Sequence, residues 1–262
     1  MKAKFLLLFA GISLLVACGG KGKFEGEAVF ELVELIKNGK EIDHDTTKNY
    51  DAEIKYYRLT EAPTYLKDSI NRQSRIFLSN WFDVPETGDF DINKLVIDDM
   101  RDFYKQVDEL DDKDCFTCRI KNIKIKGDDI YQNPNLISMN YSWYIYEGGA
   151  HGNYGKICYN YEKATGKKIN YKSLVKDEAK LLNIAQKAFK EQNGIAEDEE
   201  ITEMFQFENN TFRLNDNFGF TTEGITFYYN PYEIAPYAAG LIELTLTYDQ
   251  LKGLVNYIDH IK

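Results

Sequence analysis

Histidine is scarce in this sequence, and the common catalytic motifs are missing. The 262 residues contain three histidines, His44, His151 and His260. Neither G-x-S-x-G, which displays a nucleophilic serine, nor the zinc-protease motif H-E-x-x-H occurs. His44 lies close to an amino-terminal tether and His260 lies at the chain end, so neither is well placed to complete a metal site. We therefore expect no catalytic residues, no metal and no cofactor.

A surplus of positive charge is also absent. The chain carries 32 basic and 42 acidic residues, a net charge of −10. Loss of a signal segment over residues 1–17 would remove Lys2 and Lys4 and no acid, leaving 30 basic residues against 42 acidic ones, or −12. Such a surface repels nucleic acid and attracts cationic partners. We expect no nucleic-acid partner.

The one apolar run near the start of the chain is too short to span a bilayer. It extends from Phe5 to Val16 after two lysines, as in the hydrophobic region of a signal peptide. Its end, Leu15-Val16-Ala17-Cys18, resembles a bacterial lipobox. The resemblance implies cleavage before Cys18 and acylation of its thiol, with palmitate as a typical chain. Gly19 and the lack of a following acidic run fit the outer membrane, with the periplasmic or surface face left open. A secretory signal with a chance cysteine is the alternative.

Three cysteines remain after lipidation, at positions 115, 118 and 158. In an oxidising compartment this odd number predicts one disulfide and one free thiol. Cys115 and Cys118 have the spacing of a redox or zinc motif, but no second pair completes a metal set. We favour a structural bridge between Cys118 and Cys158 on neighbouring strands.

Hydrophobic periodicity predicts a mixture of strands and helices. Asn38-Gly39 marks a hairpin, residues 51–59 alternate as a half-buried strand, and helices follow Pro63 and Asp91. In the second half, strands are expected over 116–125, 136–146, 155–171, 212–230 and 241–248, and a helix over 177–193. Thr247-x-x-Gln250 predicts a capping box for a last short helix. The side chains expected to face the core are Trp143, Leu181, Ala185, Leu244 and Leu246.

Strands grouped apart from helices predict an α+β fold with a mainly antiparallel sheet and helices packed on it. The chain divides into a signal peptide (1–17), a tether (18–27), an amino-terminal part (28–114) and a carboxy-terminal domain (115–262).

Two loops are candidates for recognition. The first is a glycine-histidine turn between two aromatic strands, in which we expect His151 to bond the backbone; its candidate residues are Tyr146, Gly148, Gly149, His151 and Tyr154. The second is a proline-tyrosine loop, which is either a packed crossover or a recognition surface. Its candidate residues are Tyr232, Glu233, Pro236 and Tyr237.

Four stretches carry a family resemblance: YEGGAHGNYG, TGKKINYKSLV, FGFTTEGITFYYNPYEIAPYAAG and LIELTLTYDQL. They resemble the RsiV-like extracytoplasmic domain over residues 115–258, and residues 51–81 resemble its companion half more loosely. This family forms the sensor domain of a lysozyme-sensing anti-sigma factor and an accessory domain of some peptidoglycan deacetylases. The chain departs from both, because it has a lipoprotein signal in place of a transmembrane helix and lacks the deacetylase's Asp-His-His set.

Together with the lipobox-like end, the resemblance implies a lipid-anchored, non-catalytic binding protein of the cell envelope that recognises a lysozyme-like protein or peptidoglycan. The acidic surface suits a cationic protein, since complementary charge favours encounter. Two alternatives stay open: a structural envelope lipoprotein without a specific ligand, and a glycan-active enzyme that uses two carboxylates.

Overall fold

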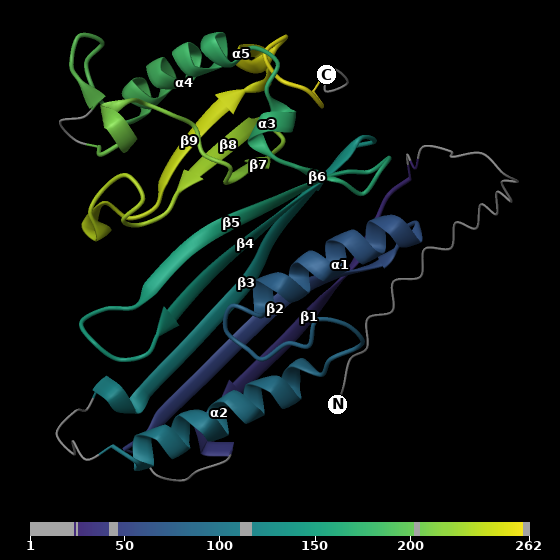
Figure 1. Ribbon diagram of the computed structural model, residues 1–262, viewed down its shortest axis with the longest axis vertical. Helices are drawn as coiled ribbons and strands as arrows, with labels where there is room; N and C mark the ends of the chain where they lie inside the picture. Colours follow the sequence, from purple (N-terminus) through teal and green to yellow (C-terminus); the bar gives the residue numbers. More distant parts are fainter. Residues whose placement is uncertain (1–23, 25, 42–46, 111–116, 202–204, 259–262) are drawn as a thin grey trace, which may run out of the picture.

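The computed structural model describes residues 24, 26–41, 47–110, 117–201 and 205–258, which form two sheets, each with its own helices (Figure 1). The larger sheet has the strand order β1-β2-β3-β4-β5-β6, and the smaller has the order β7-β8-β9. All neighbouring strands are antiparallel except β2 and β3. The predicted α+β fold is confirmed. Cys18, the signal segment and most of the tether lie outside the described residues.

The larger sheet begins with a hairpin of β1 (Val29–Asn38) and β2 (Asn49–Glu61). The hairpin was predicted, but Asn38-Gly39 is not its two-residue turn, because Asn38 pairs with Asp51. The chain instead continues through the short 3-10 helix η1 (Gly39–Glu41). A Cβ at Gly39 would lie 1.6 Å from the Tyr104 hydroxyl, so this glycine allows a close approach.

Helices α1 (Thr64–Leu78) and α2 (Ile92–Asp108) cover one face of the larger sheet. Strand β2 alternates buried and less buried residues, as expected for a strand with one face in the core. Asp91 caps α2 by accepting a hydrogen bond from the Asn93 amide at 2.9 Å. On α2 the buried face includes Val96, whereas Ile97 is only half-buried.

Strands β3 (Ile120–Gln132), β4 (Leu136–Tyr146), β5 (Asn153–Glu162) and β6 (Lys168–Ile169) complete the sheet. A short 3-10 helix, η2 (Thr117–Arg119), precedes β3. Strands from both sides of the expected division at 114/115 therefore belong to one sheet. Trp143 packs against the core but is only half-buried, with its ring 6.0 Å from that of Trp81.

The predicted bridge between Cys118 and Cys158 is wrong. Cys158 is buried with a free thiol, whereas Cys118 is disulfide-bonded. Cys118 lies beside the turn after β4, where a Cβ on Gly148 would be 3.5 Å from its Cα. Cys158 pairs with Asn140, six positions before Tyr146 at the end of β4. The two cysteines are thus about 20 Å apart along the sheet at the usual rise per residue, far beyond the reach of a disulfide.

The second half places helix α4 (Glu178–Gln192) on the small sheet of β7 (Phe218–Phe220), β8 (Gly224–Tyr229) and β9 (Ile242–Thr247). Leu181, Ala185, Leu244 and Leu246 are fully buried, as predicted. Gly194 follows α4 with φ +69°, the left-handed conformation of a helix end.

Short helices connect this half. The capping box of Thr247 and Gln250 is present, as predicted, at the start of the short helix α5 (Tyr248–Leu251). Helix α3 (Tyr171–Leu174) and the 3-10 helices η4 (Glu208–Asn210) and η5 (Tyr237–Ala239) lie in the remaining connections.

The two halves meet through polar contacts on the face of the large sheet opposite α1 and α2, here called the helix-free face. The Phe220 amide donates to Ser138 Oγ at 3.0 Å, and the Asn160 side chain donates to the Phe218 carbonyl at 2.6 Å. At the edge of β5, Asn230 Oδ1 accepts from the Lys156 amide at 2.7 Å. Asn217 Oδ1 likewise accepts from the Cys158 amide at 3.0 Å, and the side-chain amides of both asparagines donate to the Lys156 carbonyl.

Candidate functional site

The glycine-histidine turn and the proline-tyrosine loop, 80 residues apart in sequence, meet at the carbonyl of Gly152. This oxygen accepts a hydrogen bond from the Tyr237 hydroxyl at 2.8 Å and lies 2.9 Å from His151 Nδ1. Because a carbonyl can only accept, Nδ1 carries the proton and Nε2 is free to accept. The Tyr232 hydroxyl lies 3.4 Å from Nε2, a long hydrogen bond. His151 is therefore a turn histidine bonded to the backbone, as expected.

Four aromatic rings gather around this point, and we call them the aromatic loop cluster: His151, Tyr154, Tyr232 and Tyr237. The His151 ring stacks on that of Tyr237, with centroids 3.9 Å apart and planes 24° apart. Tyr154 and Tyr232 contact the Tyr237 ring at centroid distances of 5.5 and 5.6 Å. Desolvation among the rings raises the pKa of Tyr237 above its ordinary value. A tyrosine hydroxyl is protonated at neutral pH even without this shift, so it acts here as the hydrogen-bond donor.

Tyr232 is the most accessible tyrosine of the cluster. Its side chain is 64% exposed, and its backbone has φ +69°, a conformation that non-glycine residues rarely adopt. Hydrogen bonds from the Tyr232 amide to the Ala235 carbonyl and from the Glu233 amide to the Asn230 carbonyl hold the turn in place. A strained backbone that displays an aromatic ring to solvent is a typical feature of a binding loop.

The other predicted site residues shape the two loops. Gly148 and Gly149 have φ of +94° and +89°, and the Tyr146 hydroxyl closes the turn on the Gly149 carbonyl at 2.9 Å. Both carboxylate oxygens of Glu233 are engaged, one by the Asn230 amide at 2.9 Å and the other by the Asn215 side chain at 2.7 Å. Pro236 precedes η5. These residues position the rings of the cluster.

A groove of about 500 Å³ opens beside the cluster on the helix-free face, and we call it the lysine-tyrosine groove. Its floor contains two rows of residues that the strand register places side by side. One row is Lys124, Tyr144 and Tyr154; the other is Lys126, Ser142 and Lys156. Leu241, which precedes β9, also lines the groove. Tyr154 belongs to both the cluster and the groove.

The lysines of the groove differ in their partners. Lys126 forms an ion pair with Asp128 at 3.0 Å, and Asp128 also accepts from the Ser142 hydroxyl at 3.2 Å. Within the described ranges, neither Lys124 nor Lys156 has an ion-pair partner. The Lys156 ammonium instead lies 4.4 Å from the centroid of the Tyr228 ring, a cation-π distance.

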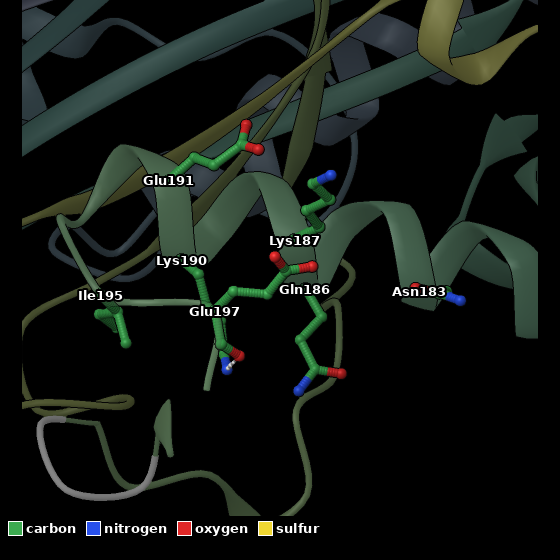
Figure 2. A pocket seen from close by; sticks show the side chains of 7 residues that line it. All are labelled: Asn183, Gln186, Lys187, Lys190, Glu191, Ile195 and Glu197. Carbon is green, nitrogen blue, oxygen red and sulfur yellow. Dashed lines mark hydrogen bonds between the residues drawn. The ribbon is translucent and has the colours of Figure 1, made fainter. Parts of the chain in front are cut away.

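A second hollow, of about 270 Å³, lies along the outer side of α4 (Figure 2). Lys190 is already used there, since its ammonium donates to the Glu197 carbonyl at 2.8 Å and to the Glu199 carbonyl at 2.5 Å. Figure 2 shows Asn183, Gln186 and Lys187 along the same helix. Lys190 thereby fastens the segment after α4, and none of the predicted site residues lines this hollow.

Within the described part of the chain, no group of three or more His, Cys, Asp or Glu side chains could hold a metal ion. The helices described there are also too short or too polar to cross a bilayer.

Sequence reasoning missed Tyr144, Lys124, Lys156 and Asn230. The alternation of residues within each strand indicated that the side chains of Tyr144 and Lys124 lie on the face of their strand that does not pack in the core. Their grouping depends on the register between strands, which no local pattern specifies.

The comparisons with known proteins divide the chain into two matched regions. Residues 172–249 match the family described as "Protein of unknown function (DUF3298)", and residues 43–154 match the family described as "Deacetylase PdaC". The latter agrees with the resemblance to a deacetylase-associated domain. No curated protein matches the sequence.

Solved structures share the whole fold. A DUF3298 family member from Bacteroides fragilis superimposes with a TM-score of 0.67 at 20% identity, over 90% of this chain and 96% of that one. A DUF3298 family protein from Pseudomonas aeruginosa gives a TM-score of 0.60 at 18% identity, over 88% and 96%. The chain thus has the fold of DUF3298 proteins, with residues 172–249 matching that family and residues 43–154 matching PdaC.

Proposed function

We propose that this chain is a non-catalytic binding protein of the cell envelope that recognises a lysozyme-like cationic protein through the aromatic loop cluster. The observation that carries the proposal is the exposed Tyr232 ring, held on a left-handed backbone against Tyr237 and His151. Rigid aromatic loops provide contact area at a low cost in conformational entropy. The net charge of −12 after signal removal and the resemblance to a lysozyme-sensing domain favour a cationic partner.

The arrangement around His151 favours recognition over catalysis. Its Nδ1 is bonded to the Gly152 carbonyl and its Nε2 faces the Tyr232 hydroxyl. A general base needs an orienting acceptor and a nucleophile within hydrogen-bond reach. The phenol of Tyr232 is the hydroxyl facing Nε2, and it lies 3.4 Å away, too far to be a well-aligned partner.

Replacing Tyr232 with alanine is expected to weaken lysozyme binding by about 2 kcal/mol, or about 30-fold in Kd. Titration calorimetry of the chain from residue 19 onward with lysozyme, at low and moderate salt, measures this change. We expect affinity to fall with salt because the attraction is between opposite net charges.

Ile76 provides the matched control, since its side chain is 48% exposed on α1, away from both loops. Ile76→Ala should bind lysozyme as the parent does. An equal loss in both variants would refute the role of the cluster. No binding at low salt would leave peptidoglycan as a ligand or a structural envelope role, which a pull-down with isolated peptidoglycan separates.

We further propose that the chain is anchored to the outer membrane through acylated Cys18. The basis is the lysine-preceded apolar run and the lipobox-like end described above. Cys18→Ser should abolish labelling by a fatty-acid analogue and shift the protein from the membrane to the soluble fraction, or block its maturation. A labelled Cys18→Ser variant, or an unlabelled parent, would contradict the anchor. Ser13→Ala, within the apolar run, serves as the control and should retain the label.

A further inference from the structure

We propose that the lysine-tyrosine groove is a second binding site, for an acidic saccharide chain whose sugar rings carry carboxylates. This goes beyond the proposed function, because it concerns the neighbouring groove, which shares only Tyr154 with the cluster, and a ligand of opposite charge. Two rows of side chains carry the inference: an aromatic row next to the loop cluster and a basic row beside it.

The aromatic row provides two pre-positioned rings. Tyr144 and Tyr154 are paired across β4 and β5, so their Cβ atoms are about 5 Å apart. The Tyr144 ring lies against Gly152, where a Cβ would be 2.5 Å from a ring carbon. The Tyr154 ring is held edge-to-face by Tyr237, at 77° between planes. Flat carbon-hydrogen faces of pyranose rings pack against such rings, and ligand sites combine apolar walls of this kind with a few placed polar groups.

The basic row lies two residues further along the same strands, which corresponds to about 7 Å. Lys126 and Lys156 flank Ser142 there, on strands that lie on either side of β4. Lys124 pairs with Tyr144 at the end of the aromatic row. A sugar chain that crosses the groove would therefore meet rings on one side and ammonium groups on the other.

Charge complementarity identifies the ligand as an anion. Lys126 and Lys55 are balanced by Asp128 and Glu53, at 3.0 and 3.2 Å. The remaining positive charge belongs to Lys124 and Lys156, which form no ion pair within the described ranges; Glu53, the strand partner of Lys124, pairs with Lys55 instead. The chain as a whole has a net charge of −10, so the positive charge of these two lysines is confined to the groove. The two tyrosine rings of the groove favour an anion that also presents sugar faces over a chain that carries charge alone.

The test is titration of the purified protein at low salt with three hexamers. Hexagalacturonate supplies rings and carboxylates, N-acetylglucosamine hexamer supplies rings alone, and hexaglutamate supplies carboxylates alone. We expect hexagalacturonate to bind at least about tenfold more tightly than either of the others. The double variant Lys124→Gln/Lys156→Gln should weaken its binding by at least about tenfold, since each lost charge-assisted hydrogen bond has that order of effect.

Two further variants separate binding in the groove from binding elsewhere on the surface. Lys94→Gln/Lys180→Gln removes two exposed lysines on α2 and α4, each paired with a neighbouring aspartate, and should leave hexagalacturonate binding unchanged. Tyr232→Ala should also leave it unchanged while weakening lysozyme binding, which separates the failure of either proposal from that of the other. Equal affinity for hexaglutamate, an unchanged Lys124→Gln/Lys156→Gln variant, or no binding of hexagalacturonate would each overturn the proposal. Thermal unfolding confirms that every variant is folded.

Discussion

Replacing Phe189 with alanine is expected to lower the free energy of unfolding by about 3–5 kcal/mol. The Phe189 side chain is fully buried in the second core, the cluster of buried side chains between α4 and the small sheet; the first core lies between the large sheet and helices α1 and α2. Four rings surround it, with centroids between 4.9 and 6.2 Å away: Phe205, Phe207, Phe212 and Tyr229. Truncation would leave a cavity that these rigid rings cannot fill, and would remove their edge-to-face contacts.

Urea denaturation monitored by both tryptophan fluorescence and circular dichroism shows which half of the protein the substitution destabilises. Trp81 and Trp143 both pack against the first core, so their fluorescence reports on the first half, while far-ultraviolet circular dichroism reports on both. If the halves unfold together, both midpoints should fall; if they unfold separately, the dichroism midpoint alone should fall. Ile76→Ala, at an exposed site, should change stability by no more than about 0.5 kcal/mol. A comparably small change for Phe189→Ala would contradict the packing of this core.

Replacing Gly224 with alanine is the second substitution with a large expected effect, at about 3 kcal/mol. A Cβ there would lie 2.0 Å from the Leu246 carbonyl oxygen and 2.8 Å from its carbonyl carbon. These are backbone atoms of the paired strand β9, so no side-chain rotation relieves the clash. The strand pairing would have to shift, although β8 is buried along its whole length and β9 buries every second residue.

Gly194 is the matched control for this prediction. It has φ +69° but no atom within 4 Å of the position that a Cβ would take, so Gly194→Ala meets only backbone strain, of about 1 kcal/mol. Thermal or urea unfolding of both variants measures the difference. Equal losses would mean that β9 does not approach Gly224 this closely.

Local patterns predicted most of the elements of the fold. The alternation in 241–248 marked β9 and its buried face, and the helix over 177–193 begins and ends within a residue of its predicted bounds. The capping box at Thr247 was also read from four residues. Each of these signals depends on side chains close together in sequence, where periodicity and capping chemistry act directly.

Features that depend on distant residues were not predicted. The parallel pairing of β2 with β3 brings together segments separated by both α1 and α2. The disulfide partner of Cys158 was expected from strand proximity alone, and the register placed the two cysteines far apart. The two recognition loops were each identified, but their junction at the Gly152 carbonyl requires a contact across 85 residues. Long-range register is set by the whole core and not by any one segment.

The two asparagines at the border of β5 have a consequence for solubility. A strand at the outer border of a sheet offers unpaired amides and carbonyls, to which a strand of another molecule can add. The side chains of Asn217 and Asn230 form hydrogen bonds with the amide and carbonyl of Lys156 and with the amide of Cys158. A side-chain amide carries the same kinds of donor and acceptor as a peptide group. The second half thereby protects this part of β5 from intermolecular strand addition, because two side chains take the place of a further strand.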